Sequence, residues 1–264
     1  LLEEVTVKNN ATIASYGELL SSAIIQEIFK YNGVRSVLKD SRELIQTESS
    51  TNRDIVSEVA TIKKITAYFK ENQSKVVLIP GFISSNALGE TTTLGRGGSD
   101  FSAAIMANAL EAKVLEIWTD VSGMYTAHPK IVTQAKPIKK LNYYEAMELS
   151  HFGAKVIYPP TLQPLVEKNI PMVIKNTFAS EDLGTLIDGN ASSENGEIVK
   201  GISHIDNVAL INLEGSGMIG ITGFSKRLFE ALSDEDINII MITQASSEHS
   251  ICLGVRSEDA LSAK

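Results

Sequence analysis

Short apolar segments typical of β-strands alternate with helical patterns through most of this 264-residue chain. Helical periodicity runs through residues 15–31, 54–70, 100–112, 142–150 and 162–169, and strand-like segments occupy residues 34–38, 75–79, 114–118 and 172–175. This alternation predicts an α/β fold with a parallel or mostly parallel sheet and helices on both faces. The polar stretch at residues 41–52 is predicted to be a loop.

The pattern changes after residues 189–196, which are rich in Ser, Asn and Gly and indicate a boundary. A strand is expected at residues 208–213, a helix at 225–233, and strands at 237–243 and 250–255. This β-α-β-β order is most of a ferredoxin-like unit. We therefore expect two domains, residues 1–198 and 199–264.

Composition excludes some classes of partner. The formal net charge of -8 argues against a nucleic-acid partner. No apolar run approaches the roughly 20 residues that span a bilayer, which argues against a membrane protein. Cys252 is the one cysteine of the chain, and its apolar neighbours predict a buried core thiol. A single cysteine fits a reducing compartment, so we expect a cytoplasmic protein.

Two segments carry the chemistry. Residues 91–100 form a glycine-rich turn that opens onto an alanine-rich helix, where backbone N–H groups and the helix dipole favour an anion. Arg96 adds a planar charged group that suits a carboxylate or a phosphate. Thr119 and Asp120 follow the next strand, where open α/β sheets usually bind ligands. Together these segments predict a site for two anionic small molecules.

Residues 91–100, 118–129 and 152–156 together resemble aspartate kinases of the amino acid kinase family, and the final module resembles the ACT effector-binding domain. The likeness runs from about Ser15 to the end. It implies an amino-acid-kinase-like three-layer sandwich, incomplete at its N-terminus, followed by a partial ferredoxin-like ACT module. It also implies phosphorylation of the L-aspartate side-chain carboxylate by ATP with Mg²⁺, giving 4-phospho-L-aspartate. That reaction is the first step of lysine, threonine and methionine biosynthesis.

The resemblance assigns roles to individual residues. It implies that the aspartate pocket contains Glu18, Phe82, Arg96, Ser99 and Asp100, with Glu18 on the ammonium group and Arg96 on a carboxylate. A carboxylate is already ionised at neutral pH, so it needs positioning and nearby positive charge rather than a general base. It implies that the nucleotide contacts are Thr119, Asp120, Tyr125, Lys130 and Lys155. Arg96, Asp100 and Lys155 are the catalytic candidates. Magnesium arrives with the nucleotide, so no dedicated metal ligands are expected.

Several of these residues also have a purely structural interpretation. Glu18 with Ser15 fits a capping box at the start of a helix. Asp100 fits a first-turn acid, Lys155 a surface lysine, and Tyr125 ordinary packing. Only their joint occurrence in family order favours the functional interpretation.

The sequence departs from the family pattern in two places. The family's amino-terminal Lys-Phe-Gly-Gly-Thr strand is absent from this sequence, and its lysine contributes charge at the transfer centre. We therefore expect the fragment to be inactive or nearly so. The family usually has Thr-x-Asp-Pro-Arg where this chain has residues 126–130, ending in Lys130. Lysine binds phosphate as a point charge, without the bidentate geometry of arginine.

In the last module, residues 215–220 resemble the ACT turn that holds an amino-acid effector, which implies that Gly217, Met218 and Ile219 contact it. Gln244 is a further candidate, with an exposed turn glutamine as the alternative. Residues 244–250 resemble the threonine-regulated, bifunctional aspartate kinase–homoserine dehydrogenase type. This likeness favours threonine over lysine as effector, a following dehydrogenase domain, and a homo-oligomer formed through the ACT modules.

Two other functions stay open. The same fold could phosphorylate a different acceptor, such as glutamate, acetylglutamate or a nucleoside monophosphate. Alternatively, the chain could be an amino-acid-sensing regulatory protein with a degenerate kinase domain.

Overall fold

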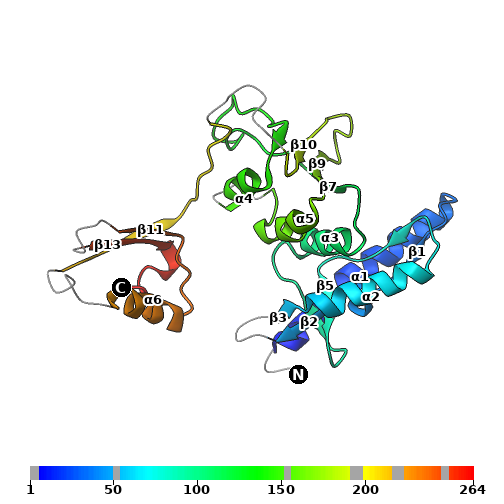
Figure 1. The fold of residues 1–264 in the computed structure, drawn as a ribbon, viewed down its shortest axis with the longest axis horizontal. Helices are drawn as coiled ribbons and strands as arrows, with labels where there is room; N and C mark the ends of the chain where they lie inside the picture. Colours follow the sequence, from blue (N-terminus) through cyan, green and yellow to red (C-terminus); the bar gives the residue numbers. More distant parts are fainter. Residues whose placement is uncertain (1–5, 50–53, 152–155, 191–198, 216–222, 245–249) are drawn as a thin grey trace. The chain divides into compact units, whose positions relative to one another are not determined.

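The structure is a computed structural model that describes residues 6–49, 54–151, 156–190, 199–215, 223–244 and 250–264. The chain divides into two compact units, Leu1–Ser203 and His204–Lys264 (Figure 1). Each unit has a hydrophobic core of its own. Within the described ranges, no helix is both long and apolar enough to cross a membrane.

Helix α1 (Val7–Tyr31) opens the first unit. Its N-cap is Thr6, whose side chain accepts a hydrogen bond from the Asn9 backbone N–H at 3.2 Å. The expected helix start at Ser15 is therefore wrong: Ser15 lies in mid-helix, 1% exposed, and its hydroxyl donates to the Thr12 carbonyl at 2.7 Å. Sequence periodicity missed the first two turns because their residues are mostly polar. Glu18 consequently caps no helix.

The buried face of α1 carries small and polar side chains, namely Ala11, Ser15, Ser22 and Gln26. Large apolar side chains such as Leu20, Ile24 and Ile28 are exposed instead. Small side chains let the helix axis come close to the strands beneath, among them β6 (Thr91–Thr93). Gln26 completes this contact, because its Nε2 donates to the Ser36 carbonyl at 3.0 Å.

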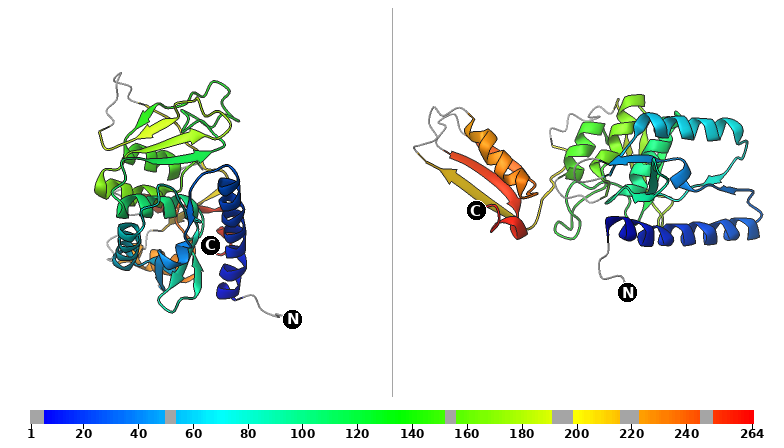
Figure 2. Two further views of the ribbon diagram at one scale, coloured as in Figure 1. Left: turned by 90° about the vertical axis from the view of Figure 1, so that its right-hand side faces the viewer. Right: turned by 90° about the horizontal axis from the view of Figure 1, so that it is seen from below.

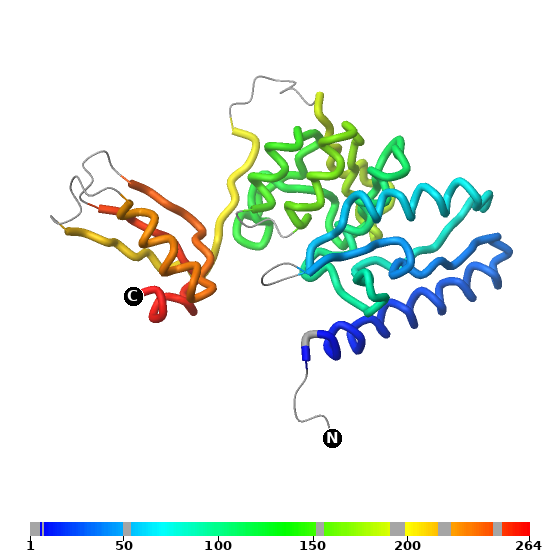
Figure 3. Tube along the Cα trace, turned by 60° about the horizontal axis from the view of Figure 1, so that its bottom comes forward, coloured from blue at the N-terminus to red at the C-terminus, as the bar shows by residue number. Residues whose placement is uncertain are grey.

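A four-stranded sheet has the order β3-β2-β5-β6. Strand β2 (Gln46–Ser49) pairs in parallel with β5 (Ile83–Asn86), whereas β3 (Asp54–Val56) and β6 pair antiparallel at the edges. Strands β1 (Val37–Leu38) and β4 (Val77–Leu78) form a separate parallel pair. Helices α1 and α2 (Glu58–Glu71) cover opposite sides of these strands (Figures 2 and 3).

The predicted loop at residues 41–52 is wrong, since it contains the 3-10 helix η1 (Ser41–Glu43) and strand β2. Its polar side chains are buried in pairs: the hydroxyls of Thr47 and Thr92 lie 2.7 Å apart, and the Ser41 hydroxyl donates to the Ile83 carbonyl at 2.9 Å. The helix expected from residue 54 begins at Glu58, because residues 54–56 pair with β2. The expected buried strand at residues 34–38 shrinks to the two exposed residues of β1.

The second sheet of this unit has the order β7-β9-β10-β8. Strand β7 (Leu115–Thr119) is parallel to β9 (Met172–Asn176), but β9 is antiparallel to β10 (Thr185–Ile187), which is parallel to β8 (Lys140–Leu141). Helices α3 (Gly98–Ala109), α4 (Tyr143–His151) and α5 (Gln163–Lys168) and the 3-10 helix η2 (Pro159–Leu162) complete the unit. The sheets are therefore mixed rather than mostly parallel, and the α/β prediction is confirmed.

In the second unit, β11 (Val208–Glu214), β13 (Ser250–Arg256) and β12 (Met241–Gln244) form an antiparallel sheet with β13 in the centre. Helix α6 (Phe224–Asp234) packs on this sheet and η4 (Ser257–Asp259) follows it (Figure 2). The predicted β-α-β-β order is present, although the second strand, β12, starts at Met241 rather than at residue 237. Ile251, Leu253 and Val255 are buried, whereas Cys252 between them is only half-buried, because successive strand residues face opposite sides.

Candidate functional site

The glycine-rich turn connects β6 to α3. Gly95 and Gly97 adopt φ angles of 70° and 67°, a region that other residues rarely occupy, and Gly97 is the N-cap of α3. The Gly98 N–H donates to the Gly95 carbonyl at 3.0 Å, which closes the turn. Arg96 lies between the two left-handed glycines, is exposed, and forms no ion pair with any residue in the described ranges. The turn thus presents a free guanidinium beside the positive end of a 12-residue helix.

Phe82 lies against the same helix end. Its φ of 68° is uncommon for a bulky residue, and two hydrogen bonds made by its own backbone groups hold it there. Its N–H donates to the Ser102 hydroxyl at 2.9 Å, and its carbonyl accepts from the Leu94 N–H at 2.8 Å. A Cβ on Gly98 would lie 3.0 Å from Phe82 Cδ2, so this glycine allows the close approach. The structure therefore brings Phe82 to the turn that carries Arg96.

Ser99 and Asp100 occupy the first turn of α3. A Cβ on Gly81 would lie only 2.9 Å from Ser99 Cα, which places Ser99 directly beside the Phe82 backbone. Asp100 is half-buried, and desolvation by this burial raises the pKa of its carboxyl. Four of the five residues expected in the aspartate pocket thus gather at one helix N-terminus.

Glu18 is the fifth, on α1. It is half-buried and lies three residues after Ser15 and four before Ser22, both of which face the sheet. Side chains at these spacings share one helix face, so Glu18 lies on the side of α1 that packs along β6. Strand β6 leads directly into the glycine-rich turn.

Thr119 and Asp120, two of the expected nucleotide residues, lie at the end of β7, and Tyr125 and Lys130 lie in the segment that follows. The Thr119 hydroxyl is 3.2 Å from Asp120 Oδ1 and donates to it, while the Thr119 carbonyl accepts from the Thr177 N–H at 2.8 Å. Tyr125 forms an isolated antiparallel bridge with Pro137. Lys130 is exposed, and its backbone N–H donates to His128 Nδ1 at 3.2 Å. Lys155 lies outside the described residues, as do Gly217, Met218 and Ile219.

Thr185 holds the loop after β7 in place, which the sequence did not reveal. Its hydroxyl accepts from the Met124 N–H at 2.8 Å and donates to the Ile138 carbonyl at 2.6 Å. It also lies against Gly123, whose φ of 108° and lack of a side chain permit the contact. Threonine is a common residue in β-strands, so the sequence around Thr185 gives no sign that its hydroxyl holds this loop.

Tyr158 is a second residue that the sequence did not reveal. It is the N-cap of η2, and its side chain lies on Gly97, where an added Cβ would be 2.5 Å from Tyr158 Cγ. The two residues are far apart in sequence, so only the fold shows their contact. The tyrosine therefore supports the turn that carries Arg96.

The segment leading out of the first unit is tied to the loop that carries Tyr125. The Ile202 N–H donates to the Thr126 carbonyl at 2.8 Å. Lys200 Nζ lies 2.9 Å from Glu145 Oε2, and this pair is largely buried on the lysine side. Glu145 also accepts from the Asn142 N–H at 2.8 Å, and the Glu145 N–H donates to Asn142 Oδ1 at 2.8 Å, so these two residues cap α4.

Among the residues that the structure describes, no three His, Cys, Asp or Glu side chains come together in a metal-binding group.

Gln244, the remaining effector candidate, is exposed at the end of β12, so it belongs to a strand rather than to a turn.

Two known families match this chain. The Amino acid kinase family matches residues 2–176, and the ACT domain matches residues 211–264. A bifunctional aspartokinase/homoserine dehydrogenase of Haemophilus influenzae is 44% identical over 94% of this chain and 31% of its own length. The lysine-sensitive aspartokinase 3 of Escherichia coli is 34% identical over 96% of this chain and 58% of its own length.

Solved structures agree with these matches. Escherichia coli aspartokinase III in complex with aspartate and ADP, in the R-state, matches with a TM-score of 0.80 and 32% identity, over 95% of this chain and 56% of that one. The same enzyme with lysine and aspartate, in the T-state, matches with a TM-score of 0.74. The present chain thus spans under two thirds of the length of these relatives.

Proposed function

The chain belongs to the amino acid kinase family, and from that premise we propose that it forms the aspartate-binding and nucleotide-binding part of an aspartate kinase. The reaction is transfer of the γ-phosphate of ATP to the side-chain carboxylate of L-aspartate, giving 4-phospho-L-aspartate. The observation that carries this proposal is the TM-score of 0.80 to an aspartokinase in complex with aspartate and ADP. The reaction opens the biosynthesis of lysine, threonine and methionine.

The aspartate half of the proposed site is the N-terminus of α3 with its glycine-rich turn. Arg96 pairs with a carboxylate of the substrate, and the helix dipole adds positive potential where a second anion approaches. Phe82 and Ser99 shape the pocket, and Glu18 receives the substrate ammonium group. Asp100 is half-buried at the first turn of α3, with a raised pKa. It orients the substrate through its carboxyl group.

The nucleotide half is the loop after β7. Thr119 and Asp120 contact the nucleoside, Tyr125 packs against it, and Lys130 and Lys155 bind the phosphates as point charges. The magnesium ion enters with ATP and neutralises charge on the phosphate oxygens, so it needs no ligand cluster in the protein. Catalysis then consists of holding two anions side by side and screening their repulsion.

The second unit supplies feedback control by an amino acid. An ACT domain match covers residues 211–264, and the T-state relative is in complex with lysine and aspartate. We favour threonine for this chain because residues 244–250 resemble the bifunctional type, and we assign the contacts to Gly217, Met218, Ile219 and Gln244. Strand β12 is an edge strand whose Ile242 is 50% exposed, which supports pairing with a second copy of the chain.

The one cysteine, Cys252, supports a cytoplasmic location.

The test is an assay of ATP-dependent hydroxamate formation from aspartate. It uses the complete reading frame that contains these residues, beside residues 1–264 alone. We expect activity with aspartate. With glutamate, acetylglutamate or a nucleoside monophosphate as the acceptor, the activity should not exceed background. Threonine binding by calorimetry without any nucleotide binding would instead support the sensor function.

A further inference from the structure

Two loops leave the carboxyl ends of the neighbouring parallel strands β7 and β9. In the register of this pair, Thr119 at the end of β7 lies opposite Asn176 at the end of β9. The Thr177 N–H donates to the Thr119 carbonyl at 2.8 Å, so the pairing continues one residue further. Open α/β sheets usually bind their ligands at this end of the strands. The loop after β9, residues 177–184, therefore lies beside the loop that we assign to the nucleotide.

Ser122 forms a second link between these two loops. The residue is 8% exposed. Its hydroxyl oxygen accepts from Asn176 Nδ2 at 3.0 Å, and its O–H donates to Asp182 Oδ2. The amide of Asn176 has a fixed orientation, because its Oδ1 accepts from the Phe178 N–H at 2.9 Å. The Ser122 hydroxyl thus uses its donor and an acceptor site on side chains that lie at the end of β9 and in the loop after it.

Asp182 is held in place by the backbone of its own loop. Its N–H donates to the Ala179 carbonyl at 3.0 Å. Ala179 in turn forms an isolated antiparallel bridge with Asn176. A closed turn therefore presents the Asp182 carboxylate to Ser122.

These links fix the loop after β7 on both sides of Asp120. The Thr119 carbonyl is bound before it and the Ser122 hydroxyl after it, and only Asp120 and Val121 lie between. Asp120 is exposed, and its Oδ1 accepts from the Thr119 hydroxyl at 3.2 Å. A side chain on a backbone that is already fixed loses less conformational entropy when it meets a ligand. The network thus prepares Asp120 for binding.

We propose that Asn176 and Asp182 are positioning residues of the nucleotide half, and that they hold Asp120 in place through Ser122. This inference rests on the proposed nucleotide role of Asp120 and adds the residues that set the affinity of that half. Neither Asn176 nor Asp182 contacts the nucleotide, because both act on Ser122. Breaking the network should therefore weaken nucleotide binding and leave aspartate binding unchanged.

The experiment uses the complete enzyme that contains these residues and measures MgADP binding by calorimetry beside steady-state kinetics. Asp182→Ala and Ser122→Ala should each raise the Kd for MgADP and the KM for ATP about fivefold, which corresponds to about 1 kcal/mol. The KM for aspartate should not change. The double variant should lose about as much affinity as Ser122→Ala alone, because both changes remove the same hydrogen bond. Asp182→Asn keeps an oxygen acceptor for the Ser122 hydroxyl and should restore most of the affinity.

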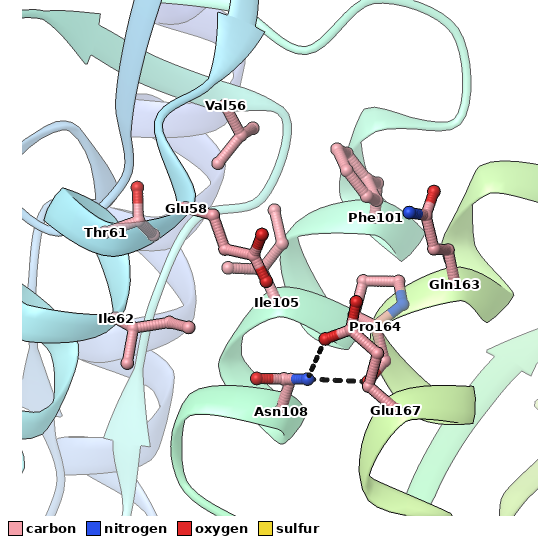
Figure 4. Close-up of a pocket in the computed structure, with 10 residues that line it drawn as sticks. All are labelled: Val56, Glu58, Thr61, Ile62, Phe101, Ile105, Asn108, Gln163, Pro164 and Glu167. Atoms are coloured by element: carbon pink, nitrogen blue, oxygen red, sulfur yellow. Dashed lines mark hydrogen bonds between the residues drawn. The ribbon is translucent and has the colours of Figure 1, made fainter.

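Two controls separate positioning from stability. Glu181→Ala removes the neighbouring exposed carboxylate of the same loop and should bind MgADP as the parent does. Asn108→Ala breaks a structural hydrogen bond elsewhere in the first unit. Asn108 Nδ2 donates to the Pro164 carbonyl at 2.7 Å, which ties α3 to α5 beside a cavity of about 190 Å³ (Figure 4). This variant should lower the free energy of unfolding without changing the Kd for MgADP.

Additive losses in the double variant would overturn the proposal, as would equal changes in the constants for nucleotide and for aspartate. The same holds if Asp182→Asn loses as much affinity as Asp182→Ala. A parent that binds MgADP but forms no hydroxamate from aspartate would contradict the proposed reaction instead. The calorimetric comparison of parent and variants would still decide the role of Asp182.

Discussion

The side chain of Tyr158 lies directly on Gly97, the left-handed residue that starts helix α3. Gly97 belongs to the turn that carries Arg96, and Tyr158 begins the 3-10 helix that leads to α5. Packing between these two residues ties the proposed aspartate pocket to a segment that follows the proposed phosphate-binding Lys155. The glycine is thus required both for its backbone angle and for the space above it.

Gly97→Ala should destabilise the first unit by about 1–3 kcal/mol, since alanine is strained at a φ of 67° and its Cβ would overlap Tyr158. Urea unfolding at pH 7 measures the loss. Gly95→Ala is the matched control, because its φ is 70° but its Cβ would meet nothing within 4 Å. Gly95→Ala should lower the free energy of unfolding by less than Gly97→Ala does. Equal losses for both variants would show that the Tyr158 contact contributes nothing.

Arg96→Ala in the complete enzyme should lower kcat/KM for aspartate by about 2–5 kcal/mol of transition-state stabilisation, because a substrate carboxylate loses its charged partner. Steady-state kinetics at varied aspartate and at varied ATP measure the two effects separately. Arg35→Ala removes another exposed arginine and should change neither constant. A loss confined to the KM for ATP would contradict the aspartate role of Arg96.

Asp100→Asn should stabilise the fold at pH 7 while lowering activity. Burial raises the pKa of Asp100 above its ordinary 3.8, so ionisation is more costly in the folded state than in the unfolded state. This cost is absent below pH 3.8, grows as pH rises through the interval up to the raised pKa, and is constant above it. The stability difference between variant and parent, from urea unfolding at several pH values, should therefore shrink toward acidic pH. A difference that grows on acidification would mean that the pKa is lowered.

Thr185→Val preserves shape but removes the hydroxyl that accepts from the Met124 N–H. A buried donor left without a partner costs about 1–3 kcal/mol, so the loop after β7 should loosen. We expect a higher KM for ATP with an unchanged KM for aspartate. Thr177→Val, at an exposed threonine, is the control and should behave as the parent does. Equal changes in both KM values would place Thr185 outside the nucleotide half.

Sequence patterns located the elements that have clear periodicity or caps. The glycine-rich turn that opens onto α3 and the strands β7 and β9 follow from local chemistry, whereas strands β2, β3, β5, β6, β8 and β10 were not predicted. The prediction of an exposed loop from polar residues was wrong where polar side chains form hydrogen bonds with distant parts of the chain. Thr47 is polar in sequence yet fully buried, because Thr92 shares its hydrogen bond from a strand far along the chain.

The sequence also predicted which residues gather at one part of the candidate site. Arg96, Ser99 and Asp100 adjoin in sequence, so their placement at one helix end followed from the glycine-rich motif. Tyr158 and Thr185 were missed because each acts through a glycine that is distant in sequence. Such contacts depend on tertiary packing, which no local pattern encodes.

The Ile202–Thr126 hydrogen bond has an energetic consequence for regulation. A backbone hydrogen bond contributes about 0.5–1.5 kcal/mol, and the partly buried Lys200–Glu145 pair beside it adds a comparable amount. Allosteric coupling free energies are typically about 1–3 kcal/mol. Making or breaking these two links, at the end of the first unit, would therefore supply a free energy of the size that the proposed control by an amino acid needs.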